Sequence, residues 1–207
     1  MKILVLTGYD KTYENNQLGI LSERKNKNYA EVNGYDFYSD KECNPNLHHF
    51  FYKFESVLKF IDSYDYILWI DADAFFVNHS IKIESFIKEN KTFIVTIDRE
   101  YLNTGVFIVK CCDEIKHIFN KILLEGPKLQ HPFPDAKILM DYFNNDDSTW
   151  DVIKPQYLLN SYKYELYGMV HEEGEFKNGE SIILHFPGMP YNKRVESYYK
   201  YNVESLK

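Results

Sequence analysis

The sequence predicts an α/β fold, in which a mixed, mainly parallel sheet is flanked by helices. Short apolar runs alternate along the chain with stretches whose apolar residues recur at helical spacing. The run Tyr66–Ile70 is apolar without interruption, which is typical of a strand buried on both faces. With 207 residues, 44% of them hydrophobic, the chain is long enough for a substantial core.

The first half of the chain predicts strands and helices in alternation. Residues 2–7 are apolar and stop at Gly8. Residues 18–32 carry apolar side chains at helical spacing, and Gly34 stands where a helix C-terminus favours glycine. In chain order we expect a strand at 2–7, a helix at 18–32, a strand at 35–38, a helix at 50–61 and the strand at 66–70.

The second half has shorter elements and ends in a charged segment. Gly126-Pro127 stops one predicted helix, and Pro134 begins another at a first-turn position. We expect a short surface helix or turn at 81–87, strands at 92–97 and 106–109, helices at 115–124 and 134–143, a polar loop at 144–148, a strand at 181–184 and a terminal helix at 191–206. There is no internal repeat or linker-like stretch, so we expect a single domain over residues 1–207.

Charge and composition exclude several classes of function. The net charge is −7 and no large cluster of basic residues occurs, so nucleic acid is not an expected partner. No apolar run approaches the roughly 20 residues of a membrane-spanning helix, and no signal sequence opens the chain, so we expect a cytoplasmic protein. Cys43 and the adjacent Cys111 and Cys112 have neither metal-ligand spacing nor a disulfide pattern.

Asp71 and Asp73 directly follow the apolar run at 66–70. Side chains two apart in extended backbone point to the same side, so we expect the two carboxylates to converge. Paired carboxylates suit a hard divalent cation, and open α/β sheets bind ligands at the carboxyl ends of their strands. An Asp-x-Asp triplet in an arbitrary context is more often part of a turn. Here the flanking residues are apolar, which favours a functional site.

His185 also directly follows an apolar run, Ile182-Ile183-Leu184, and we expect it at the end of a strand. A histidine at a strand end is more often a hydrogen-bonded structural residue when it stands alone. Beside the carboxylates of Asp71 and Asp73, it completes an O,O,N ligand set suited to Mn²⁺ or Mg²⁺.

At this point the chain resembles the GT-A-fold galactosyl-, mannosyl- and xylosyltransferases of the eukaryotic secretory pathway. The resemblance extends over about residues 2–190 and rests on several short motifs in the same order. These are residues 2–8, Asn28-Tyr29-Ala30, Gly34-Tyr35, Lys53, Trp69-Ile70-Asp71-Ala72-Asp73-Ala74, Asn103-Thr104-Gly105-Val106-Phe107-Ile108, Pro134-Asp135 and His185-Phe186-Pro187-Gly188. It implies a GT-A (Rossmann-like) fold.

The resemblance also implies an activity and its participants. It implies a Mn²⁺-dependent (or Mg²⁺-dependent) transfer of a hexose or pentose, with retention, from a UDP- or GDP-linked sugar to a hydroxyl of a carbohydrate-type acceptor. Asp71, Asp73 and His185 would ligate the metal, Asn103 would lie beside the donor sugar, and Asp135 would lie near the reacting centre. The residues expected at the donor are Thr7, Gly8, Tyr9, Lys53, Asp71, Ala72, Asp73, Gly105, Gly188 and Lys193, with Arg194 as an alternative to Lys193.

Some assignments within this resemblance stay open. Family members usually carry Asp-Gln where this chain has Asp135-Ala136. Asp135 would orient donor hydroxyls in a retaining reaction and would be the candidate base in an inverting one; it could also be a first-turn residue favoured by the helix dipole. Residues 1–110 would form the nucleotide-sugar-binding half, residues 111–190 the half that completes the acceptor and metal sites, and residues 191–207 a helical tail.

Two other functions are compatible with parts of the pattern. A phosphatase or phosphotransferase of the haloacid-dehalogenase type also carries Asp-x-Asp after an apolar strand, and its first Asp is the nucleophile. That motif usually follows the first strand, whereas here it begins at Asp71. A catalytically inactive module that binds sugar nucleotides is the non-enzymatic alternative. Hydrolysis of p-nitrophenyl phosphate would favour the former, and tight UDP binding without turnover the latter.

Overall fold

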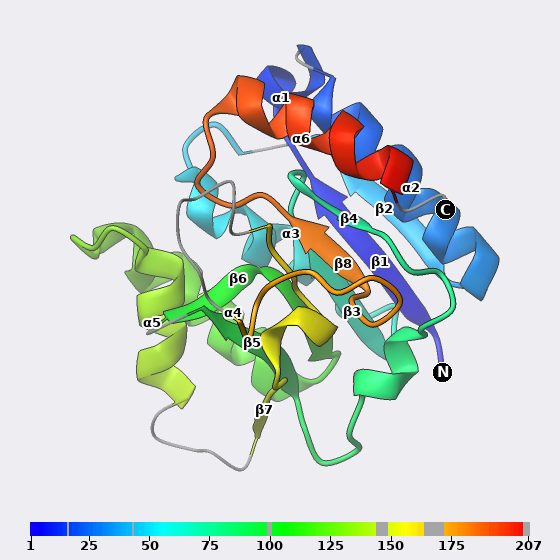
Figure 1. Ribbon diagram of the computed structural model, residues 1–207. Helices are drawn as coiled ribbons and strands as arrows, with labels where there is room; N and C mark the ends of the chain where they lie inside the picture. The colour runs from blue at the N-terminus through cyan, green and yellow to red at the C-terminus, as the bar shows by residue number, and fades with distance from the viewer. Residues whose placement is uncertain (16, 43, 99–100, 144–148, 164–171, 205–207) are drawn as a thin grey trace.

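A computed structural model describes residues 1–15, 17–42, 44–98, 101–143, 149–163 and 172–204 (Figure 1). Its centre is a six-stranded sheet. The strands in spatial order are β2 (Asp36–Asp40), β1 (Ile3–Gly8), β3 (Tyr66–Ile70), β6 (Tyr101–Lys110), β5 (Phe93–Asp98) and β7 (Trp150–Val152). β6 is antiparallel to both of its neighbours, and the other pairs are parallel. The predicted mixed, mainly parallel sheet is therefore confirmed.

One face of the sheet is covered by α3 (Tyr52–Phe60), α4 (Asp113–Glu125) and α5 (Pro134–Phe143). Alternate residues of each strand point to this face because the side-chain period of a strand is two. Leu4 and Leu6 of β1 lie in this core, whereas Ile3 and Val5 lie in the core on the opposite face. The strands are apolar on both sides for this reason.

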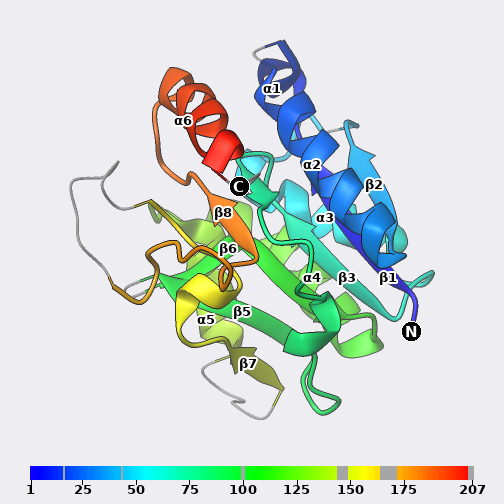
Figure 2. The same ribbon diagram turned by 45° about the vertical axis from the view of Figure 1, so that its right-hand side comes forward.

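The opposite face is covered by α2 (Leu18–Asn33) and by a two-stranded antiparallel sheet of β4 (Ala74–Phe76) and β8 (Ile183–His185). α6 (Tyr191–Glu204) packs beside α2 and the short α1 (Lys11–Asn15), outside this small sheet (Figures 1 and 2). A third apolar cluster, which includes Leu18, Phe75 and Tyr198, joins these layers. The C-terminal helix is thus held over the start of α2.

Several local predictions agree with the structure. α2 ends at Gly34, whose φ of 75° is the left-handed conformation that glycine adopts without strain. α5 has the expected bounds. The 3₁₀ turns are η1 (His49–Phe51), η2 (Ile83–Phe86), η3 (Gly126–Lys128) and η4 (Gln156–Leu158). The turn η2, expected at the surface, buries Ile83 and Phe86. The loop predicted at 144–148 and the residue Cys43 lie outside the described residues.

One local prediction was wrong, and two short elements were missed. β6 begins at Tyr101, so residues 102–105 lie inside the strand and do not precede it. The strand expected at 181–184 is present as β8, and it pairs with β4, which was not predicted. α1 was also missed, since five residues are too few to show a helical period. In the part of the chain that the structure describes, no helix combines the length and the apolar composition needed to span a membrane.

Candidate metal centre and active site

The polar side chains singled out from the sequence gather at one edge of the sheet, where β1 and β3 end. β6 is antiparallel to β3, so its first half lies at the same edge; Val106 is opposite Ile70 in register. Gly105 and Asn103 are therefore brought beside Asp71, which follows β3. This is the edge at which open α/β sheets bind ligands.

Asp71 and Asp73 converge, but for a different reason from the one predicted. The backbone from Asp71 to Ala74 forms a turn, closed by a hydrogen bond from the Ala74 N–H to the Asp71 carbonyl at 3.0 Å. The extended geometry assumed for the pair was wrong. Asp71 is held by two further hydrogen bonds: its N–H donates to the Gly105 carbonyl at 2.8 Å, and the Trp69 indole N–H donates to its Oδ1 at 2.6 Å.

The structure brings His185 to the two carboxylates. β8 pairs with β4 so that His185 lies opposite Ala74, and the Phe186 N–H donates to the Asp73 carbonyl at 3.0 Å. Asp71, Asp73 and His185 each offer one ligand atom, and these atoms all lie within 4.8 Å of one another. The His185 Nε2 is 3.3 Å from Asp73 Oδ1. The convergence required for a metal site is present, and the role of the three residues as ligands stays a prediction.

Gly105 lies directly against the side chains of Asp71 and His185. A Cβ at Gly105 would be 3.0 Å from both Asp71 Oδ2 and His185 Nε2, and would overlap with His185 Cε1. Only a residue without a side chain leaves this space open. The two carboxylates and the imidazole form an oxygen-rich donor set with one nitrogen, which suits Mn²⁺ or Mg²⁺. The residues therefore fit a divalent cation.

We predict that Gly105→Ala weakens Mn²⁺ binding by at least about tenfold, because the added methyl group displaces His185 or Asp71 from the ion. The overpacking should also cost about 1–3 kcal/mol of stability. Isothermal titration with Mn²⁺ and urea unfolding measure the two effects. Gly34→Ala is the control, since it strains a helix terminus without touching the site. Equal Mn²⁺ affinity in Gly105→Ala and wild type would contradict this account of Gly105.

Lys53 joins Asp71 to Asp135 beneath the same edge. Its Nζ lies 3.3 Å from Asp135 Oδ2 and 3.7 Å from Asp71 Oδ2, and it donates to the Thr104 carbonyl and Oγ1 at 3.2 and 3.1 Å. The Thr104 hydroxyl also donates to Asp135 Oδ2. Burial lowers the pKa of Lys53, but Asp71 and Asp135 outweigh this effect and hold the pKa above its usual value. Lys53 is therefore a buried cation between two carboxylates.

The two carboxylates of the Asp-x-Asp turn have opposite pKa shifts. Burial raises the pKa of Asp71 above its usual value; Lys53 opposes this shift and the negative charge of Asp73 adds to it. Burial also acts to raise the pKa of Asp73, but His185 and Arg194 outweigh it and lower the pKa below its usual value. Asp73 is thus the carboxylate that the surroundings stabilise most strongly in its charged form.

Arg194, in the first turn of α6, reaches this site. Its Nη1 lies 3.0 Å from Asp73 Oδ2 and donates to the Tyr13 hydroxyl of α1. Lys193 does not point the same way: its side chain is 58% exposed and pairs with Glu196 at 3.0 Å. Of the two basic residues considered from the sequence, the structure brings Arg194 to the acidic pair.

The expected nucleoside-binding segment is closely packed. Thr7, Gly8 and Tyr9 are all buried. A Cβ at Gly8 would lie 2.6 Å from the Tyr52 ring and 2.9 Å from the Asp40 carbonyl, so Gly8 is needed for this packing. The Tyr9 hydroxyl donates to Glu23. Binding of a nucleoside to this segment stays a prediction.

Two further predicted residues occupy turns. Ala72 is 7% exposed within the Asp-x-Asp turn. Gly188 has a φ of 68° and faces open space, so its backbone adopts a conformation that other residues rarely take. Its approach to a diphosphate stays a prediction.

Several residues of the site were missed from the sequence. Thr104 and Trp69 lie inside the recognised motifs but had no role, because their partners come from other elements. Asn160 is fully buried beside His185, and its Oδ1 lies 3.2 Å from His185 Nδ1. In the sequence, Asn160 could have been singled out as a polar residue that directly follows the apolar Leu158 and Leu159.

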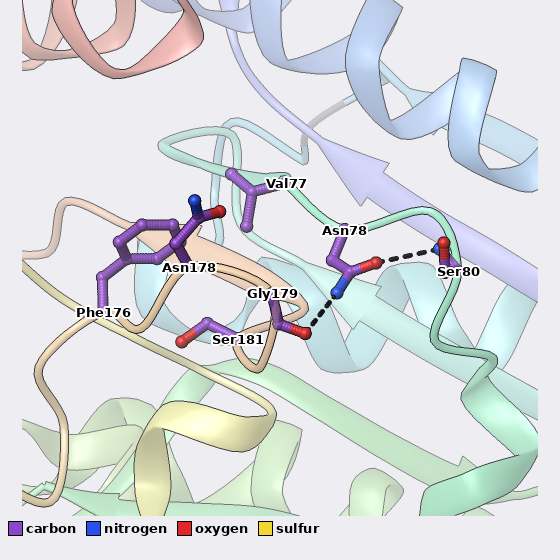
Figure 3. A pocket seen from close by; sticks show the side chains of 7 residues that line it. All are labelled: Val77, Asn78, Ser80, Phe176, Asn178, Gly179 and Ser181. Atoms are coloured by element: carbon purple, nitrogen blue, oxygen red, sulfur yellow. Dashed lines mark hydrogen bonds between the residues drawn. The ribbon is translucent and has the colours of Figure 1, made fainter. Parts of the chain in front are cut away.

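A surface cavity of about 340 Å³ lies at the other end of the small sheet. It is lined by Val77, Asn78, Ser80, Phe176, Asn178, Gly179 and Ser181 (Figure 3). The Asn78 amide bridges two of its walls, with hydrogen bonds of 2.9 Å to the Gly179 carbonyl and from the Ser80 N–H. None of the predicted site residues lines this cavity.

Residues 1–91 match the model of the galactosyl transferase GMA12/MNN10 family. The fold is similar to that of a glycosyltransferase involved in the glycosylation of the major capsid of PBCV-1, with 19% identity and a TM-score of 0.76 over 97% of this chain and 100% of that one. It is also similar to the glycosyltransferase GlyE of Streptococcus pneumoniae TIGR4, with 14% identity and a TM-score of 0.57 over 98% and 64% of the two chains.

The galactosyltransferase LgtC, solved with donor and acceptor sugar analogs, has 12% identity and a TM-score of 0.54 over 95% of each chain. No curated protein matches the sequence. The TM-scores of these solved structures show a shared fold, and the family model matches the first 91 residues. The chain therefore has the fold of GT-A glycosyltransferases, and its first 91 residues resemble the galactosyl transferase GMA12/MNN10 family.

Proposed function

We propose that this protein is a metal-dependent glycosyltransferase that moves a hexose or pentose from a UDP- or GDP-linked donor to a hydroxyl of a glycan-type acceptor, with retention of configuration. The observation that carries the proposal is the convergence of Asp71, Asp73 and His185 at the carboxyl edge of the sheet. Mn²⁺ is the preferred ion, with Mg²⁺ as the alternative. A bound divalent cation would act as a Lewis acid toward the diphosphate leaving group.

The residues of the chain have distinct tasks in this proposal. Asp71, Asp73 and His185 hold the cation. Arg194, which already lies at this site, directs its positive charge toward the diphosphate. Preorganised positive charge at a leaving group is often the largest catalytic contribution, because it needs no reorganisation during the reaction. The net charge of −7 would otherwise disfavour an anionic donor.

Asp135 suits an orienting role better than that of a base. It is only 2% exposed, and its Oδ2 is occupied by Lys53 and Thr104. A base in an inverting reaction must reach the acceptor hydroxyl. A carboxylate held in this way supports retention, in which no strong protein base is needed. Asn103, in β6 next to Thr104, stays the residue expected near the donor sugar; its Oδ1 accepts from the Gly105 N–H and from Asn160, and its Nδ2 donates to Tyr162.

The proposed activity is tested by hydrolysis of UDP- and GDP-sugars with and without Mn²⁺, followed by transfer to a panel of glycan acceptors. Thermal shift with the same donors finds the one that binds, since a ligand specific for the native state raises the melting temperature. Absence of both donor binding and turnover would overturn the proposal. The phosphatase and the inactive binding module are not favoured by the family match or by the fold.

We predict that Arg194→Ala lowers the rate of donor hydrolysis by about 10²-fold, because one charge-stabilising contact to the leaving group is lost. Lys193→Ala is the matched control, since Lys193 is the adjacent basic residue and its partner is the exposed Glu196. Its rate should stay within about twofold of wild type, as expected for a surface pair. Steady-state kinetics of donor hydrolysis by both variants test this prediction. An equal loss of rate in the two variants would contradict a specific role of Arg194 at the leaving group.

A further inference from the structure

Asn160 lies directly behind His185, on the side away from the proposed ion. It is 0% exposed. Its Oδ1 faces His185 Nδ1 at 3.2 Å, and its Nδ2 donates to Asn103 Oδ1 at 2.9 Å. No motif of the sequence drew attention to this residue. Its amide is the link between His185 and β6.

The direction of this hydrogen-bond chain is set by a backbone group. The Gly105 N–H, which can only donate, meets an atom of the Asn103 side chain at 3.0 Å, and that atom must therefore be the Oδ1 oxygen. The Asn103 oxygen is then an acceptor for Asn160 as well, so the Asn160 NH₂ group faces Asn103. The Asn160 oxygen consequently faces His185.

An amide oxygen only accepts hydrogen bonds, so Nδ1 of His185 must carry a proton. In the neutral imidazole the lone pair then lies on Nε2, the atom 3.3 Å from Asp73 Oδ1. This lone pair and Asp73 Oδ1 are both acceptors, so a positive charge must lie between them at that distance, either a metal ion or a proton on Nε2. The tautomer set by Asn160 is therefore the one that a metal ligand requires.

We propose that Asn160 is a positioning residue: the chain Gly105–Asn103–Asn160 holds His185 with its proton on Nδ1 and its Nε2 lone pair directed at the cation. This inference rests on the proposed function of Asp71, Asp73 and His185 as a metal site. The groups that orient a ligating histidine typically contribute 10- to 100-fold to metal affinity. A residue that only filled space would contribute to stability and leave the tautomer unchanged.

The tautomer is measured directly on the wild-type protein without metal, by long-range ¹H–¹⁵N correlation at neutral pH. The His185 signals are identified by their loss in His185→Gln. In the neutral imidazole we expect the proton on Nδ1 and none on Nε2. A neutral imidazole with its proton on Nε2 would overturn the proposal without any variant of Asn160.

Two substitutions at Asn160 separate orientation from stability. Asn160→Leu removes the acceptor, so we expect the tautomer to change and Mn²⁺ affinity to fall about 10- to 100-fold. Asn160→Asp keeps an acceptor opposite Nδ1 but removes the donor to Asn103, so it should be less stable and yet keep the proton on Nδ1 and most of the affinity. If Asn160→Leu does not fold, loss of the Nδ1 proton in Asn160→Asp would overturn the proposal.

Mn²⁺ alone is the probe, measured by isothermal titration. Asn33→Ala is the control, since the Asn33 amide donates to the backbone carbonyls of Tyr29 and His79 and its loss should not change the affinity. A wild-type protein that binds no Mn²⁺ would overturn the proposed function itself. A wild-type protein that binds Mn²⁺ no more tightly than Asn160→Leu would overturn the inference about Asn160 alone.

Discussion

Replacing Asp73 by asparagine should lower Mn²⁺-dependent donor hydrolysis by about 10³-fold or more, because it removes a charged ligand from the centre that stabilises the leaving diphosphate. The substituted amide would keep the shape of the side chain, so the loss would report charge and not packing. The variant should also lose the rise in melting temperature that Mn²⁺ gives to wild type. Kinetics and thermal melts with and without Mn²⁺ measure both effects.

The stability of the metal-free Asp73→Asn protein should fall as well. Asp73 lies 3.0 Å from Arg194 and 3.3 Å from His185, so its neutralisation leaves Arg194, only 14% exposed, without its carboxylate. Asp62→Asn is the control, because Asp62 is 75% exposed and pairs with the surface residue Lys116. Retention of Mn²⁺-dependent turnover in Asp73→Asn would remove Asp73 from the set of ligands.

Lys53→Met is expected to destabilise the protein by about 3 kcal/mol, because it leaves the buried Asp135 and the partly buried Asp71 without their shared cation. Turnover should also fall, since Asp71 and Asp135 would repel each other and move apart. The double variant Lys53→Met/Asp135→Asn should recover part of the stability and none of the activity. Urea unfolding gives the free energies, and a cycle completed by the single variant Asp135→Asn isolates the coupling of the pair.

Lys116→Met is the matched control for Lys53, since it removes the same type of charge from a pair with Asp62 in which both side chains are exposed. Its cost should stay below about 1 kcal/mol. A cost of that size for Lys53→Met would mean that the buried cluster is not held together by Lys53.

The regular elements of the fold were largely predictable because each depends on neighbouring residues. β3 is five apolar residues in a row, and a strand buried on both faces needs such a run. α2 stops at Gly34 because glycine adopts the left-handed conformation there without strain. α5 has an early proline, whose missing N–H would be unpaired in the first turn in any case. At these positions the neighbouring residues alone account for the observed strand or helix end.

Pairings between distant segments were not predictable in this way. β4 has three residues and becomes a strand only because β8 supplies its partner. The same pairing carries His185 to Asp73. Arg194 and Lys193 are equivalent in sequence, and only the packing of α6 against α1 and α2 decides which of them points inward.

The sequence by itself determined the α/β class of this protein, the edge of the sheet at which the candidate site lies, and the side chains Asp71, Asp73 and His185, because these follow from apolar runs and from the residues that end them. Only the tertiary structure decided that the Asp-x-Asp segment is a turn, that Gly105 keeps the space between Asp71 and His185 open, and that Asn160 and Lys53 hold the polar groups in place. The physical reason is that a buried polar group needs its partner in space, and the chain brings that partner from any distance along its length.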